Sequence, residues 1–135
     1  MNSPTAPVLA DSGTVSDASL YVFNGAASSD RACDLTGCTH GDSIVIGFNT
    51  SSSTTFAADQ MVSKIGSGAT SAFVLVHVAP TFDADFTCSP CRWGDYGGAT
   101  PDPTKKGGTH GEVWFTNETV LSDHTNGTWN WEASP

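Results

Sequence analysis

Positive charge is scarce in this chain: 5 lysines and arginines stand against 14 aspartates and glutamates, which leaves a formal charge of −9. A chain with this balance repels phosphate backbones and anionic headgroups, so nucleic acid and membrane surfaces are not expected as partners. The sequence also lacks an apolar run long enough for a membrane-spanning helix. Its N-terminus lacks the basic and apolar regions of a signal peptide, so a secreted form would have lost its leader.

Helical periodicity is missing as well. Residues 56–65 come closest to an apolar period of 3.6 residues, but their MVSKI segment also alternates like a strand. Short runs rich in Val, Ile, Phe, Tyr and Trp are separated instead by Gly, Ser, Asp and Pro, which predicts an all-β fold. These runs are LYVF (20–23), SIVIGFN (43–49), QMVSKI (60–65), SAFVLVHV (71–78), RWGDY (92–96), EVWFTN (112–117) and TWNWEA (128–133).

The chain contains an internal repeat. Residues 24–30 (NGAASSD) match residues 96–102 (YGGATPD), and Thr-His-Gly-Asp at 39–42 matches Thr-His-Gly-Glu at 109–112. Each copy then runs into an apolar stretch. The agreement in order and spacing indicates that one supersecondary unit is used twice.

The repeat predicts two sheets in tandem. We expect a first unit within residues 19–80, with strands at 20–25, 43–49, 60–65 and 71–79, and a second unit within residues 81–135. The strands expected in the second unit are 92–99, 112–118 and 127–132, so that its fourth strand is missing. Residues 1–18 form an N-terminal arm or a lone edge strand. Tandem four-stranded antiparallel sheets are typical of β-propeller blades, so the chain is a propeller fragment or a propeller completed by oligomerisation.

The segments RWGDYGGATPDP…GEVWFTNE and DSIVIGFNTSSSTTF resemble the C-terminal blades of secreted bacterial β-propellers of the sialidase-like type. The repeated positions are similar to the Asp-box of that family, which implies a carboxylate that accepts turn amides and an aromatic side chain packed under the hairpin. The second copy has Thr100, Asp102, Gly111 and Trp114, and the first has Ser28, Asp30, Gly41 and Ile44. A long insertion between Asp and Gly departs from the usual box. The equivalent histidines His40 and His110 are expected to make a repeated hydrogen bond where each second strand begins.

Arginine is too scarce for the catalysis that the resemblance suggests. Sialidases resemble one another in a triad of arginines that grips the substrate carboxylate, whereas this chain has two, Arg31 and Arg92. An enzyme is therefore not expected. Two alternatives stay open: a fragment of a sialidase-like glycoside hydrolase, and a carbohydrate-binding module that stacks a glycan on Trp129 and Trp131, which share one side of a strand.

The 4 cysteines allow three pairings. In a propeller blade the loop with Cys33 and Cys38 lies on the face opposite the loop with Cys88 and Cys91. We therefore expect two local disulfides, Cys33–Cys38 and Cys88–Cys91, with zinc and free thiols as alternatives.

Other sequence features carry weaker signals. Asn49, Asn117 and Asn126 begin glycosylation sequons, which are frequent by chance in a chain rich in Ser and Thr. Acidic loops at 30–42 and 83–85 could hold calcium, but neither has the residue order of an EF-hand, so no cofactor is expected.

Together these features predict a non-enzymatic extracellular structural or binding module. We expect it to form a homo-oligomer or polymer through blade faces and through exchange of edge strands. Residues 6–15 of the arm are the segment expected to supply the missing strand of the second unit, from the same chain or from a neighbour.

Overall fold

A computed structural model of the chain describes residues 9, 11–32, 41–82, 96–104, 111–120 and 131–134. Every regular element within these ranges is a β-strand, which confirms the predicted all-β class. The strands are β1 (Tyr21–Ser29), β2 (Ser43–Ser51), β3 (Ala58–Ile65), β4 (Val74–Val78), β5 (Gly98–Pro101), β6 (Val113–Val120) and β7 (Trp131–Ser134). No helix in the described part of the chain has the length and apolarity needed to cross a membrane.

Strands β1 to β4 form one antiparallel sheet in chain order. Within the ambiguous segment 56–65, residues 58–65 form strand β3 and pair along their whole length with β2. The turn after β3 requires glycine, since Gly66 has a φ of 50°. The register of β1 is interrupted between Phe23 and Ala26, where Asn24 also has a positive φ of 56°.

Strands β5, β6 and β7 form a second antiparallel sheet, again in chain order. Strand β6 lies at its centre, and β5 and β7 are both edges. The strands expected at 92–99 and 127–132 fall partly on residues 92–95 and 127–130, which lie outside the described residues. The described portions of those two strands begin at Gly98 and Trp131.

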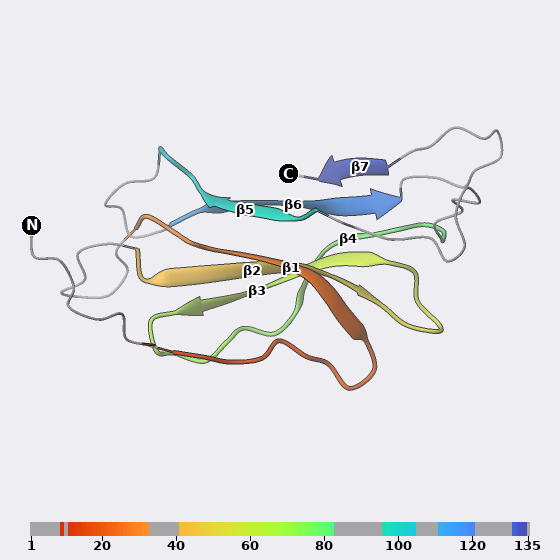
Figure 1. Ribbon diagram of the computed structural model, residues 1–135, viewed down its shortest axis with the longest axis horizontal. Coiled ribbons are helices and arrows are strands. Elements are labelled where there is room, and N and C mark those ends of the chain that lie inside the picture. Colours follow the sequence, from red (N-terminus) through yellow and green to blue (C-terminus); the bar gives the residue numbers. More distant parts are fainter. Residues whose placement is uncertain are drawn as a thin grey trace, which may run out of the picture.

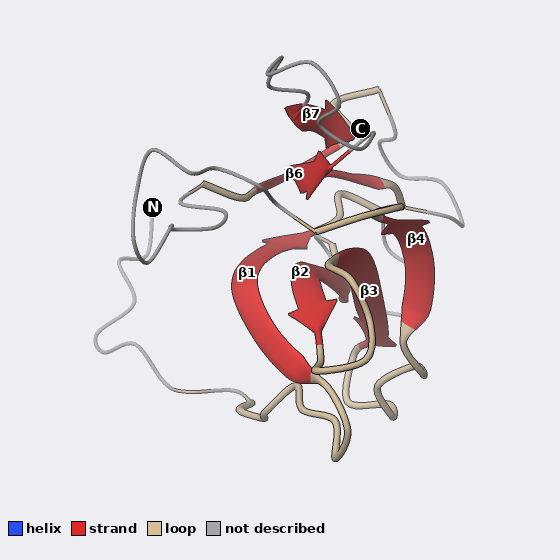
Figure 2. Ribbon diagram, turned by 90° about the vertical axis from the view of Figure 1, so that its right-hand side faces the viewer, coloured by secondary structure: helices blue, strands red, loops and turns tan. Residues whose placement is uncertain are grey.

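The two sheets lie face to face, with β1 against β5 and β2 against β6 (Figure 1). Figure 2 shows the same arrangement from the side, with β6 and β7 layered over the curved first sheet. At the contact, Gly47 of β2 lies directly beneath the ring of Phe115 of β6. Phe48, which is 1% exposed, points to the other side of β2 and packs edge-on against Phe73, with ring centroids 4.9 Å apart.

The N-terminal arm does not extend the second sheet. Its described residues 11–17 form no strand, and residues 11–15 lie over the outer face of β2 and β3, on the side of the first sheet away from the second. The prediction that this segment closes the second sheet within its own chain is therefore wrong for these residues. The physical reason is the apolar surface of Ile44, Ile46 and Val62, against which Val15 is partly buried.

We predict that Gly47→Ala lowers the free energy of unfolding by about 1–3 kcal/mol, because the added Cβ would collide with the ring of Phe115. Gly25→Ala is the matched control, since it adds the same methyl group to a strand position with open space around it. Urea denaturation of both variants measures the difference. Equal stability of the two variants would show that the sheets do not approach each other at Gly47.

Candidate functional site

Two aspartates occupy matching places at the ends of the first strands of the two sheets. The backbone N–H of Asp30 donates to the carbonyl of Ser43 at 3.0 Å, and that of Asp102 donates to the carbonyl of Glu112 at 2.9 Å. Each bond closes the connection between the first and second strands of its sheet. Asp30 is 5% exposed and Asp102 is 7% exposed, so both carboxyl groups lie in the interior.

The two carboxylates accept backbone amides in different ways. Asp30 Oδ1 accepts the N–H of Ser43 at 3.2 Å, across the hairpin. Asp102 Oδ1 accepts both the N–H and the hydroxyl of Thr104 at 2.7 Å, within its own turn. The chain packs so tightly here that a Cβ at Gly41 or at Gly111 would collide with atoms of Asp30. Because Gly111 belongs to the second repeat, the two repeats meet at Asp30.

The structural register differs by one residue from the match that the sequence suggests. Next to the two closing bonds, Ile44 pairs with Ser29 in the first sheet and Val113 pairs with Pro101 in the second. Ile44 is therefore the structural counterpart of Val113, and Val45 is the counterpart of Trp114. A shift of one residue moves a side chain to the opposite face of its sheet. Trp114 accordingly points away from the first sheet and is 51% exposed, so it does not pack under the hairpin as the resemblance implies.

Several predicted site residues cannot be placed. His40, His110, Trp129, Asn126, the 4 cysteines and the acidic pair at 83 and 85 lie outside the described residues, and of Trp131 only the backbone in β7 is described. Within the described ranges, no group of three or more His, Cys, Asp or Glu side chains is arranged to hold a metal ion. Thr100 and Ser28 occupy matching positions on β5 and β1, two residues before their aspartates.

A layer of amide side chains connects the two sheets. Asn49 Nδ2 donates to Asp59 Oδ1 at 2.5 Å and to the carbonyl of Glu118 at 3.2 Å. Asn24 Nδ2 donates to Asn49 Oδ1 at 3.4 Å, and Asn117 Nδ2 donates to the carbonyl of Asn24 at 3.4 Å. Because Asn49 and Asn117 are 0% and 3% exposed, the structure gives no support to glycosylation at these two sequons.

Asp59 is a buried carboxyl group at the edge of this layer, opposite His77 of β4. Burial raises the pKa of Asp59 to about 6, although the nearby His77 and the hydrogen bond from Asn49 both lower it. Asp59 Oδ2, His77 Nε2 and Thr119 Oγ1 are buried and have no hydrogen-bond partner among the residues that the structure describes. No motif in the sequence marks Asp59, because its neighbours Asn49 and His77 come from two other strands, β2 and β4.

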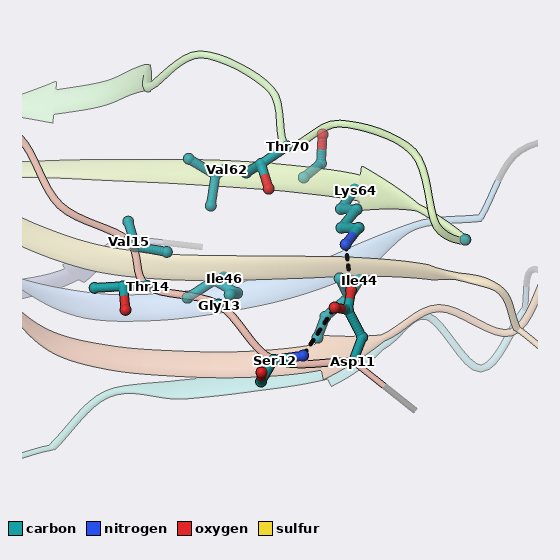
Figure 3. Close-up of a pocket in the computed structure, with 12 residues that line it drawn as sticks. Asp11, Ser12, Gly13, Thr14, Val15, Ile44, Ile46, Val62, Lys64 and Thr70 are labelled. Atoms are coloured by element: carbon teal, nitrogen blue, oxygen red, sulfur yellow. Dashed lines mark hydrogen bonds and ion pairs between the residues drawn. The ribbon is translucent and has the colours of Figure 1, made fainter. Parts of the chain in front are cut away.

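The outer face of the first sheet carries a cavity of about 360 Å³ beneath the N-terminal arm (Figure 3). Asp11 forms an ion pair with Lys64 of β3, and Asp11 Oδ1 also accepts the N–H of Ser12 at 2.8 Å. The residues that line the cavity are Asp11, Ser12, Gly13, Thr14, Val15, Ile44, Ile46, Val62, Ser63, Lys64, Gly66 and Thr70. The arm therefore covers an apolar surface without filling the space above it.

Strand β4 forms an exposed apolar edge of the first sheet. Among the described strands it pairs with β3 alone, and four of its five residues are apolar side chains that are 40–58% exposed. These residues are Val74, Leu75, Val76 and Val78. A second hollow, of about 330 Å³, is lined by Met61 and Val76 of the first sheet and by residues 112–115 of the second.

Comparisons with models of known protein families, with curated proteins and with solved structures found no match for this chain. The interpretation of these faces and edges therefore rests on their geometry.

We predict that Asp102→Ala and Asp30→Ala each destabilise the fold by about 1–2 kcal/mol, because each removes an acceptor from a backbone amide in the interior. Asp102→Asn is the control, since its side-chain oxygen can still accept from Thr104. Thermal denaturation measures all three variants. If both alanine variants match the parent, the repeated aspartates contribute nothing to the turns.

We also predict that stability falls as the pH rises from about 4 to 7. The pKa of Asp59 in the folded chain, about 6, lies above its ordinary value of 3.8, so the folded state binds more protons across this window and loses stability as they leave. Asp59→Asn should remove about 1–3 kcal/mol of this dependence, because an amide side chain does not titrate. Its oxygen can still accept the hydrogen bond from Asn49, so the contact itself is kept. Denaturation midpoints measured at several pH values test this, and identical profiles for parent and variant would contradict it.

Proposed function

We propose that this chain is a non-enzymatic extracellular module of β-propeller type, which self-associates through the edges and faces of its sheets. The observation that carries the proposal is β4, an edge strand whose apolar side chains are exposed on a chain that is otherwise strongly acidic. Monomeric β-proteins usually protect such edges with charge, proline or a covering loop. An unprotected apolar edge fits a strand that pairs with another copy.

The second sheet supports the same proposal from its other end. Its described strands number three, and β7 pairs only with β6. A fourth strand added beside β7 would give both sheets the same four-stranded order. In donor-strand exchange, the main-chain hydrogen bonds supply affinity and the alternate side chains supply specificity.

Several features of the two sheets together fit a β-propeller. Both sheets are antiparallel and ordered along the chain, they stack face to face, and each begins with a hairpin closed at a buried aspartate. These features fit the sialidase-like resemblance of the sequence. A closed propeller typically has four to eight blades, so two such units need further copies to complete a ring.

The chain offers little for glycoside hydrolysis on its own. It has two arginines, of which Arg31 is exposed beside the first hairpin and Arg92 is outside the described residues. Tyr21 and Tyr96 are 71% and 89% exposed, so neither is enclosed in a substrate site. Binding to a glycan array would favour the carbohydrate-binding alternative, and turnover of a sialoside would favour the enzyme-fragment alternative.

We predict that the native mass exceeds the 14.0 kDa of one chain at micromolar concentrations, as discrete multimers or as a polymer. Leu75→Lys should shift the population toward monomer by about tenfold or more, because it places a charge on the pairing edge. Phe56→Lys, at an exposed apolar residue outside β4, is the matched control. Light scattering after size-exclusion chromatography measures the masses, and a parent chain that is monomeric throughout would refute self-association.

A further inference from the structure

We infer that the outer face of the first sheet is a docking surface for the outer face of the second sheet of another copy, and that residues 11–15 occupy this surface in the single chain. The inference rests on the proposed self-association and specifies which faces meet. Its premise is the contact that the chain already makes between its own two sheets.

The internal contact joins two non-equivalent faces of the repeat. On β2, Gly47 is a position that faces the second sheet, and the side chain of β6 that packs on it is Phe115. Ala27 pairs with Ile46 and Ala99 pairs with Phe115 at the same distance from the closing bonds, so the repeat counterpart of Phe115 is Ile46. Ile46, however, lies on the outer face of the first sheet. The packed face of the second unit thus corresponds to the outer face of the first.

Contacts between non-equivalent faces are open-ended. A head-to-tail contact of this kind leaves one unused face on each of the two units. As further copies add through these faces, the assembly closes into a ring or continues as a filament. Within the described residues, the faces that no other strand covers are the outer face of the first sheet, where Ile44 and Ile46 lie beside the packed Phe48–Phe73 pair, and the outer face of the second sheet, with Trp114 and Thr116. If the outer face of the first sheet in one copy docks on the outer face of the second sheet in another, the contact between chains repeats the contact within one chain.

The side chains on the two free faces are complementary in size. Inside the chain, the large ring of Phe115 packs on Gly47, which has no side chain. By the same register, the smaller Ile46 of one copy would pack on Thr116 of the next, because Thr116 is the counterpart of Gly47. A smaller side chain packed over a larger one keeps the total side-chain volume at the contact similar, as well-packed interiors require. This match favours a second copy as the occupant.

The arm does not pack tightly against the docking surface. It leaves a cavity of about 360 Å³, enough space for several water molecules, above Ile44, Ile46 and Val62. Among the described residues 11–15, the polar contact with the sheet is the ion pair of Asp11 with Lys64, whose side chains are 59% and 22% exposed. Exposed ion pairs of this kind contribute little to binding. A second copy can therefore displace the arm.

The test compares association constants, measured by sedimentation velocity, for variants of the arm and of the two faces. Asp11→Asn, which breaks the ion pair, should tighten association by about two- to fivefold, and deletion of residues 1–16 should tighten it further. Thr116→Arg and Ile44→Arg, one on each free face, should each weaken association by about tenfold or more. Thr54→Arg, in the exposed loop after β2, is the control and should change nothing.

The outcomes separate this inference from the proposed function. If the parent chain assembles and Leu75→Lys weakens the assembly while Thr116→Arg and Ile44→Arg do not, the chain associates through its edges and the docking faces are refuted. If deletion of residues 1–16 weakens association instead, the arm donates a strand and does not block a face. If neither the parent nor the arm deletion associates at any concentration, both the inference and the proposed function fail. Circular dichroism of each variant confirms that a lost assembly is not a lost fold.

Discussion

The close approach of Phe115 to Gly47 is the constraint on which the rest of the structure depends. Packed sheets are held apart by the side chains between them. Because position 47 carries no side chain, the ring of Phe115 seats directly on the backbone of β2. This brings β6 near enough for Asn49 to donate to the carbonyl of Glu118. The same approach decides which face of each sheet is covered and which remains outside.

The amide layer between the sheets makes that contact specific. Buried polar groups are costly unless they are hydrogen-bonded, so the linked amides of Asn24, Asn49 and Asn117 favour one alignment of the sheets over others that an apolar contact would tolerate. Asp59 is the exception in this layer, since one of its oxygens has no partner within the described residues and its pKa is raised to about 6. The protonation of Asp59, where β3 meets β4, is therefore expected to change near pH 6.

The surfaces left outside have a common character. The edge of β4, the outer face under the arm and the outer face around Trp114 all expose apolar groups on an acidic chain. Each is the kind of surface that a neighbouring unit covers inside a larger repeated structure. The outer face under the arm and the outer face around Trp114 lie on opposite sides of the two-sheet stack, which supports the proposed assembly.

The sequence by itself determined the all-β class and the approximate positions of β1 to β4 and of β6, because alternation and turn residues are local signals. The strands expected at 92–99 and 127–132 overlap β5 and β7 only at their ends. The tertiary structure decided which face of each strand is covered. The sequence match makes Ile44 the counterpart of Trp114, whereas the strand register makes it the counterpart of Val113, and that difference of one residue reverses the faces. Only folding brings Asn49, Asp59 and His77 together and lays the arm on Ile44 and Ile46, since these contacts join residues far apart in the chain, whose pairing no local pattern records.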